Sequence, residues 1–179
     1  MAVIFQSIAE PLAAKGVCRV ADDQLDKLDL DLLKLLVEEP KAGVREYARR
    51  LNVARGTVQS RLDKFARVGV VTSYRPQMQP SALGYPLLAF VHLHIAQSMM
   101  NDTCAQLETI PEVLEVNSVA GEGDLLCRVV ARDHDDFETV LQAIIACKGV
   151  LRTRSEMVLS RRIMPRIVPL LEKTRAGAP

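Results

Sequence analysis

The sequence contains no apolar run that approaches the roughly 18 residues needed to span a membrane. Its first sixteen residues lack a basic leader and a long apolar core, so we expect no secretory signal. The four cysteines, Cys18, Cys104, Cys127 and Cys147, lie far apart and form no CxxC pair, which disfavours a zinc site. These absences predict a cytoplasmic protein whose thiols are reduced and mostly buried.

The net charge is only +1, but the charges are divided unevenly along the chain. Residues 41–75 carry nine Lys and Arg against two acids, a balance of +7. Residues 99–150 carry three Lys and Arg against ten acids, a balance of −7. The first segment suits contact with a polyanion, which the second would repel. The simpler alternative is that these charges only solvate exposed helix faces.

The first half of the chain has the apolar spacing of a small helical domain. Residues 1–24 have weak periodicity and are predicted to be a flexible arm. Residues 25–38, and then the stretches GVREYARRL and ARGTVQSRLDKFARVG, each place apolar side chains along one helical stripe. The small Ala48 permits a close helix crossing, and Asn52 tolerates the left-handed backbone of a tight turn. We therefore predict a helix-turn-helix with a third helix packed behind it.

The second helix of this pair exposes polar and basic side chains that suit base edges and phosphates. After it, VVTSYRPQMQP is predicted to form two short strands, a wing that carries Arg75, until Pro76 and Pro80 end the pairing. The alternative is a solvated helix in a plain three-helix bundle. The candidate DNA-contacting residues are Arg45, Arg55, Thr57, Gln59, Ser60, Arg61, Lys64 and Arg75.

From Gly84 the apolar period changes to two, as in strands with one buried face. The predicted strands are YPLLAFVHLHIA, VLEVNSVA, LLCRVVAR and VLRTRSEMVLS. One helix is expected within 99–110, and another in DHDDFETVLQAIIACKG, where Asp133 is a plausible cap and Phe137, Val140, Leu141, Ile144 and Ile145 form the apolar stripe. The resulting order, β-α-β-β-α-β, is ferredoxin-like. The sheet face without helices keeps Phe90, Val130 and Val158, so it is best buried against another subunit.

Taken together, residues 25–160 resemble the Lrp/AsnC family of transcription factors, the leucine-responsive or feast/famine regulators. The resemblance is carried by LDKLDLDLLKLL, REYARRLNVARGTVQSRLDKFARVGVV, the linker LGYP and VAGEGDLLCRVVARDHDDF. It implies a DNA-binding regulator of amino-acid metabolism that responds to a free amino acid. It also implies a homodimer on near-palindromic double-stranded DNA, assembly to tetramers or octamers, no cofactor, and association with a prokaryotic nucleoid.

The resemblance assigns a role to the turn between the second and third strands. In the family, a glycine-rich acidic turn lines an amino-acid pocket at a subunit interface. Backbone N–H groups of glycines can hold a carboxylate, and Asp124 is the candidate partner of the α-ammonium group. The implied effector-binding residues are Gly121, Glu122, Gly123, Asp124, Thr153, Ser155 and Met157. A plain hairpin turn with solvated acids is the alternative.

The chain departs from the family pattern at three positions. Ala54 stands where the family often has a serine cap, Gly123 replaces an aromatic residue of the turn, and Glu156 stands where some relatives have an aromatic. The last two changes alter the expected size and charge of the effector. We therefore keep open an architectural DNA-binding protein without an effector.

An enzyme is the third alternative, because some relatives of this family decarboxylate a modified haem. Those relatives carry tryptophan-bearing motifs, and this chain has no tryptophan. His92 and His94 stand two apart on one strand face without a third ligand nearby. No catalytic or metal-binding residue is therefore predicted.

The expected fold class is α+β, with an N-terminal winged helix-turn-helix and a C-terminal ferredoxin-like domain for effector binding and oligomerisation. The expected divisions are the arm (1–24), the winged helix-turn-helix domain (25–76), a linker (77–85), the ferredoxin-like domain (86–162) and a C-terminal tail (163–179). The tail is expected to form a short helix followed by disorder.

Overall fold

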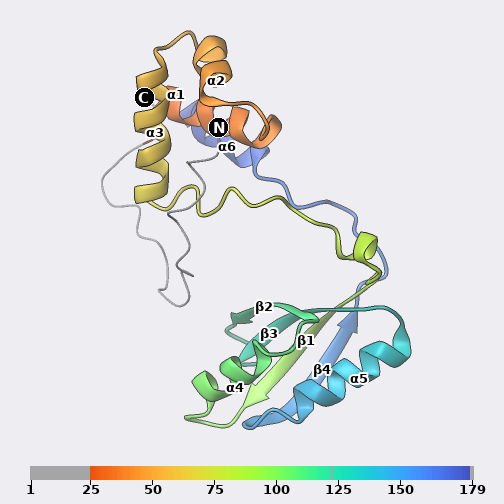
Figure 1. Ribbon diagram of the computed structural model, residues 1–179. Helices are drawn as coiled ribbons and strands as arrows, with labels where there is room; N and C mark the ends of the chain where they lie inside the picture. The colour runs from red at the N-terminus through yellow and green to blue at the C-terminus, as the bar shows by residue number, and fades with distance from the viewer. Residues whose placement is uncertain (1–24, 122, 178–179) are drawn as a thin grey trace. The chain divides into compact units, whose positions relative to one another are not determined.

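The computed structural model describes residues 25–121 and 123–177, which divide into two compact units. Unit 1 comprises residues 25–75 together with 165–177, and unit 2 comprises residues 76–164 (Figure 1). The predicted arm, residues 1–24, lies outside the described residues. Within the described ranges, no helix is both long and apolar enough to cross a membrane.

Unit 1 is built on three helices, α1 (Lys27–Glu38), α2 (Val44–Leu51) and α3 (Arg55–Arg67). Their apolar stripes meet in one core, in which Tyr47, Val58 and Phe65 are buried. Ala48 is also buried, and Asn52 caps α2 in the left-handed conformation with φ 53°. The predicted helix-turn-helix, with a third helix behind it, is confirmed.

A fourth helix, α6 (Val168–Gly177), belongs to unit 1 and packs against α1. Leu171 contacts the core, and two ion pairs flank it. Lys34 Nζ lies 2.7 Å from Glu172 Oε1, and Arg175 Nε lies 2.6 Å from Asp31 Oδ1. The short helix predicted in the C-terminal tail, residues 163–179, is therefore confirmed, whereas its docking on α1 was not predicted.

The wing strands predicted after α3 are not formed, since residues 69–79, all of them described, contain no strand. The helix ends at Arg67 with Val68 as its C-cap, and Gly69 follows with a φ of 73° that reverses the chain. The backbone N–H groups of Val70 and Val71 then donate to Phe65 O at 3.0 and 3.3 Å. Both valines pack against the core of unit 1. The apolar pair therefore folds back under α3 instead of pairing as a hairpin.

Unit 2 is a four-stranded antiparallel sheet with two helices. Its elements are η1 (Pro80–Leu83), β1 (Leu87–Ile95), α4 (Met100–Leu107), β2 (Val113–Ser118), β3 (Leu125–Ala131), α5 (His134–Ile145) and β4 (Val150–Met157). The strand order is β2-β3-β1-β4, and every neighbouring pair is antiparallel. This is the predicted β-α-β-β-α-β arrangement, and with the helix-turn-helix it confirms the α+β class.

The core of unit 2 lies between the sheet and the helices α4 and α5, which cover the same face (Figure 1). Alternate residues of β1 point into it, so Ala89, Val91 and Leu93 are fully buried. Asp133 caps α5 as predicted, because its side chain accepts from the backbone N–H of Asp136. Ile145, predicted to belong to the apolar stripe of α5, is instead exposed.

Candidate nucleic-acid interface and effector turn

The helix α3 begins at an exposed position of unit 1. Ala54 is its N-cap and makes no side-chain cap bond, as expected from the missing serine. Arg55, the first helical residue, is exposed. The N-terminal end of a helix carries unsatisfied N–H groups and partial positive charge, so this end of α3 favours an anion.

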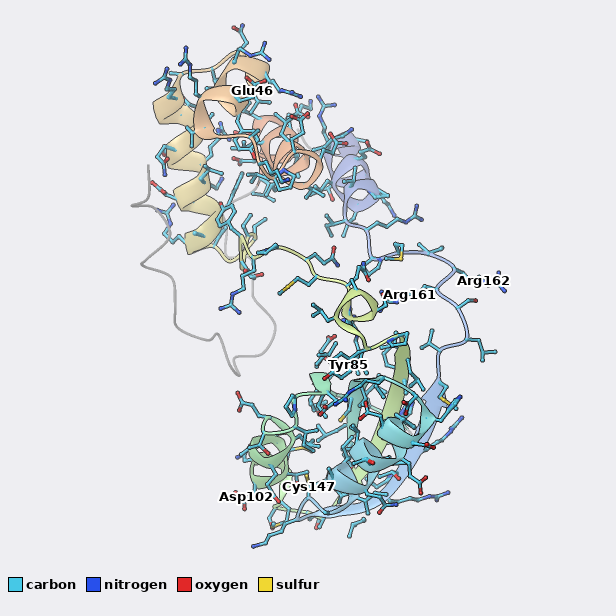
Figure 2. The ribbon with its side chains drawn as sticks, turned by 45° about the vertical axis from the view of Figure 1, so that its right-hand side comes forward. Glu46, Tyr85, Asp102, Cys147, Arg161 and Arg162 are labelled. Atoms are coloured by element: carbon cyan, nitrogen blue, oxygen red, sulfur yellow. The ribbon has the colours of Figure 1, made fainter. Side chains whose placement is uncertain are left out.

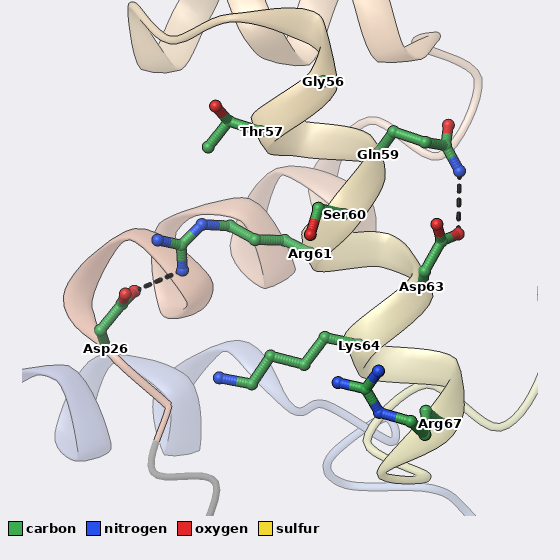
Figure 3. Close-up of a pocket in the computed structure, with 9 residues that line it drawn as sticks. All are labelled: Asp26, Gly56, Thr57, Gln59, Ser60, Arg61, Asp63, Lys64 and Arg67. Carbon is green, nitrogen blue, oxygen red and sulfur yellow. Dashed lines mark hydrogen bonds and ion pairs between the residues drawn. The ribbon is translucent and has the colours of Figure 1, made fainter.

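Below this end, α3 lines a concavity of about 950 Å³ (Figure 3). Five of the eight predicted DNA-contacting residues border it together. They are Thr57, Gln59, Ser60, Arg61 and Lys64. Arg55 lies at the start of α3, Arg45 is exposed on α2, and Arg75 lies in the irregular segment after α3, so the structure does not gather these three with the others.

Two cations on α3, Arg61 and Lys64, already have partners within unit 1. Arg61 Nη1 donates to Asp26 Oδ1 at 2.7 Å and to Asp29 Oδ1, and Lys64 Nζ lies 3.1 Å from Asp29 Oδ2. Burial favours a lower pKa for Arg61, but the hydrogen bonds to Asp29 and Asp26 outweigh it and raise that pKa. Burial favours a higher pKa for Asp26. Its hydrogen bonds with the Asp29 N–H and with Arg61 outweigh this effect, so the pKa of Asp26 is lowered overall. The charges predicted to face DNA are thus partly compensated.

The same concavity identifies a residue that the sequence reasoning missed. Arg67, in the last turn of α3, borders it beside Lys64. The signal was present in the sequence, because basic residues at 61, 64 and 67 recur every three positions and share one helix face.

On α2, two of the three basic residues, Arg49 and Arg50, are paired as well. Glu46, labelled in Figure 2, accepts from Arg49 Nη2 at 2.6 Å and from Arg50 Nε at 2.8 Å. These hydrogen bonds lower the pKa of Glu46 to about 2. Arg50 also pairs with Glu39. The +7 balance of residues 41–75 therefore overstates the positive charge available on this surface.

The turn between β2 and β3 lies directly against the backbone of β1. Asp124 N donates to Leu93 O at 2.9 Å, and Asp124 Oδ2 accepts from Ile95 N at 2.7 Å. A Cβ added at Gly123 would lie 3.2 Å from Leu93 O, a tight contact that favours glycine at this position. Gly121 adopts φ 138°, open to glycine but strained for other residues. Glu122 lies outside the described residues.

The remaining predicted effector residues lie on β4, on the other side of β1 from the turn. Leu93 pairs with Leu125 of β3 and with Thr153 of β4, so Thr153 is one strand away from the turn. Ser155 and Met157 pair with Val91 and Ala89, farther along the strand. At roughly 3.4 Å per residue, Met157 lies about 14 Å beyond Thr153. Within one chain the structure therefore places Thr153 near the turn and Met157 away from it.

In the described part of the chain, no three His, Cys, Asp or Glu side chains lie close enough together to hold a metal ion. His92 Nε2 lies 4.0 Å from Glu156 Oε1. Cys127 and Cys147 are buried unpaired thiols, Cys147 lying just beyond α5 (Figure 2). Burial raises the pKa of Cys127 to about 12, so this thiol stays neutral and unreactive.

Two family models match the chain along most of the described residues. Residues 25–65 match the AsnC-type helix-turn-helix domain, which contains α1, α2 and most of α3. Residues 88–168 match the Lrp/AsnC ligand binding domain, which contains the sheet with α4 and α5.

Known proteins agree with these matches. HTH-type transcriptional regulator FL11 of Pyrococcus horikoshii is 27% identical over 135 residues, 75% of this chain and 89% of that protein. The structure of E. coli AsnC superposes with a TM-score of 0.75 at 26% identity, covering 82% of this chain and 99% of that one. The feast or famine regulatory protein from M. tuberculosis, complexed with L-methionine, has a TM-score of 0.73 at 34% identity, covering 80% and 97%.

Proposed function

Because this chain belongs to the Lrp/AsnC family of transcriptional regulators, we propose that it binds DNA through α3 and that a free amino acid modulates this binding from the turn between β2 and β3. It is a transcriptional regulator rather than an enzyme, since its family and its relatives are regulators.

For DNA binding, the supporting observation is the shape and chemistry of the α3 face. Thr57 and Ser60 offer hydroxyl groups, and Arg61, Lys64 and Arg67 offer cationic donors around one concavity. Such groups contact phosphates and base edges when a helix enters the major groove. Arg55 at the exposed helix start is the cation best placed to meet a phosphate, because the helix dipole acts in the same direction. In a dimer, two such helices would read half-sites about one helical turn apart.

For assembly, the supporting observation is the sheet face of unit 2 that neither α4 nor α5 covers. Phe90 and Val158 are only half-buried there. Leu88, two residues before Phe90 on β1, is half-buried on the same face. A second copy placed against this face would remove this apolar surface from water, and the resulting dimer would be the unit for tetramers or octamers.

The observation that carries the effector proposal is the way Asp124 closes the turn onto β1. One carboxylate oxygen accepts from Ile95 N, which fixes the side chain at a defined place. A carboxylate has further acceptor capacity, so it can also pair with an α-ammonium group. The backbone N–H groups of Gly121 and Gly123 suit the α-carboxylate of the same ligand. Two relatives of known structure are complexes with L-methionine, which supports an amino acid as the ligand class.

The test is a thermal-unfolding screen with each of the common amino acids. A ligand that binds the folded state raises the melting temperature, and the hit is then repeated on Asp124→Asn. Asparagine keeps an oxygen that can accept from Ile95 N but loses the charge that pairs with the ammonium group. Asp135→Asn is the matched control, because Asp135 is an exposed acid in the first turn of α5, at the opposite end of β3 from the turn.

We expect one or a few amino acids to stabilise the wild type and Asp135→Asn, and to lose this effect in Asp124→Asn. Stabilisation that survives in Asp124→Asn would remove the turn from the proposal. If no amino acid stabilises the wild type, the effector role is refuted and the architectural alternative takes its place.

A further inference from the structure

Two carboxylates at the start of α1 hold two cations of α3. Asp26 is the N-cap of α1, and Asp29 lies in its first turn. Together they form the acid pair. Arg61 Nη1 is bound by one oxygen from each acid, and Lys64 Nζ is bound by the second oxygen of Asp29. Figure 3 shows Arg61 extended from α3 toward Asp26, across the concavity of the proposed DNA interface.

The acid pair is built into the fold rather than added to its surface. The Asp29 side chain is 0% exposed, and its oxygens also accept the backbone N–H of Asp26. The Asp26 side chain accepts the backbone N–H of Asp29 at 2.7 Å, which completes a capping box. A buried carboxylate requires such partners because an unpaired charge in the interior is costly. The positions of Arg61 and Lys64 are therefore set by α1, a helix outside the helix-turn-helix pair.

The charges of these four side chains cancel, and this affects DNA binding. Nonspecific affinity for DNA comes from cations that neutralise phosphates and release counterions. A phosphate must compete with the acid pair for Arg61 and Lys64. The bonds to the acid pair use only Nη1 of Arg61, so its other N–H donors keep their capacity for directed hydrogen bonds to a base edge.

We propose that the acid pair is a specificity-determining element, which withholds the charge of Arg61 and Lys64 from nonspecific phosphate contacts while it orients both side chains. The inference rests on the proposed function, because it takes α3 as the helix that faces DNA. It assigns a role in DNA selection to two acids of α1.

Asp26→Asn tests this inference without removing the helix cap. Asparagine is as good an N-cap as aspartate, and the Asp26 side chain is 54% exposed, so the change leaves no cavity. It removes one of the two negative charges on Arg61. Glu38→Gln is the matched control, because it removes one negative charge from the other end of α1, where Glu38 lies 3.8 Å from Lys34.

The measurement is fluorescence anisotropy of the full chain with two labelled duplexes, one of random sequence and one selected by the wild type from a random pool. Affinities are taken between about 50 and 200 mM salt. For Asp26→Asn we expect random-sequence affinity to rise several-fold at low salt, and the slope of log K against log salt to steepen by up to about 0.9, the value for one added phosphate contact. The ratio of selected to random affinity should fall, and Glu38→Gln should behave as the wild type.

A double variant tests whether the effect of Asp26→Asn on DNA binding comes from releasing Arg61 or from a general structural change in unit 1. In the Arg61→Ala background, Asp26→Asn should no longer steepen the salt slope, because the released cation is absent. An unchanged or flatter slope in Asp26→Asn, or an equal change in Glu38→Gln, would overturn the inference. Arg55→Ala shows whether the proposed function itself fails. If α3 faces DNA, Arg55→Ala should bind DNA more weakly than the wild type. Wild-type affinity of Arg55→Ala would mean that α3 is not the DNA-facing helix.

Discussion

Replacing Arg61 with alanine should destabilise the helical unit even in the absence of DNA. The change removes the guanidinium that binds Asp26 and Asp29, and it leaves the fully buried carboxylate of Asp29 with Lys64 and the Asp26 N–H. Breaking a buried ion pair costs about 3–5 kcal/mol when the remaining charge has no other partner. Here Lys64 remains, and the Arg61 side chain is 22% exposed, so water screens part of the loss. We expect a loss of about 1–3 kcal/mol.

For a unit of this size, each kcal/mol corresponds to roughly 4–8 °C in melting temperature. Arg61→Ala should therefore melt about 5–20 °C below the wild type, whereas Arg55→Ala, which removes an exposed side chain, should stay within about 0.5 kcal/mol. Thermal unfolding followed by far-ultraviolet circular dichroism gives the shift. Hydrogen exchange of the amides of α1 and α3 then assigns it to unit 1. Equal stability of Arg61→Ala and Arg55→Ala would refute the reasoning, because the ion pairs to Asp29 would then contribute nothing.

Three further changes test other parts of the structure. Gly149→Ala should cost about 2–4 kcal/mol in urea unfolding, because φ is +95° there and a Cβ would lie 2.6 Å from the buried Thr103 Oγ1; wild-type stability would contradict this packing. Glu46→Gln should flatten the dependence of stability on pH. The pKa of Glu46 is lowered to about 2, so its contribution is complete above its ordinary 4.5 and is lost as pH falls from there, and an unchanged acid profile would contradict the pairing. Leu171→Ala should lower the stability of unit 1 by about 1–2 kcal/mol and speed amide exchange in α1, and exchange at the wild-type rate would mean that α6 does not dock there in solution.

The helical unit was predictable from the sequence wherever apolar spacing decided the outcome. The stripe that includes Tyr47, Val58 and Phe65 has the helical period, and these side chains are buried. Asn52 in the turn was predictable because few residues adopt the left-handed conformation it shows. In the sheet, the strict alternation along β1 predicted its buried face for the same reason.

The prediction of wing strands was wrong because two adjacent apolar residues are too few to show the alternating pattern of a strand. Val70 and Val71 have a high strand propensity, but their N–H groups donate to the carbonyl of Phe65 and their side chains pack against the core of unit 1. A tertiary contact therefore outweighed the local preference. Docking of α6 on α1 was missed for a related reason, since it depends on Lys34 and Glu172, which are far apart in the sequence.

The candidate interface was predictable only in part, as five residues along α3, and its geometry was not predictable. Polar and basic residues on the exposed face of α3 follow from helical spacing. The direction of Arg61 depends on Asp29, 32 positions earlier in the chain, and no local pattern links the two. In the same way, the bond from Ile95 N to Asp124 joins a turn to a strand 29 positions away. Long-range hydrogen bonds of this kind decide what each candidate residue can offer a ligand.

The central claim is that amino-acid binding in unit 2 changes DNA binding by unit 1, and linkage provides its most direct test. The affinity for a selected duplex is measured by anisotropy with and without the amino acid that raises the melting temperature. The account predicts a change of at least about five-fold in the wild type, equal to a coupling of about 1 kcal/mol, and no change in Asp124→Asn. Equal DNA affinity of the wild type with and without the amino acid would contradict the account.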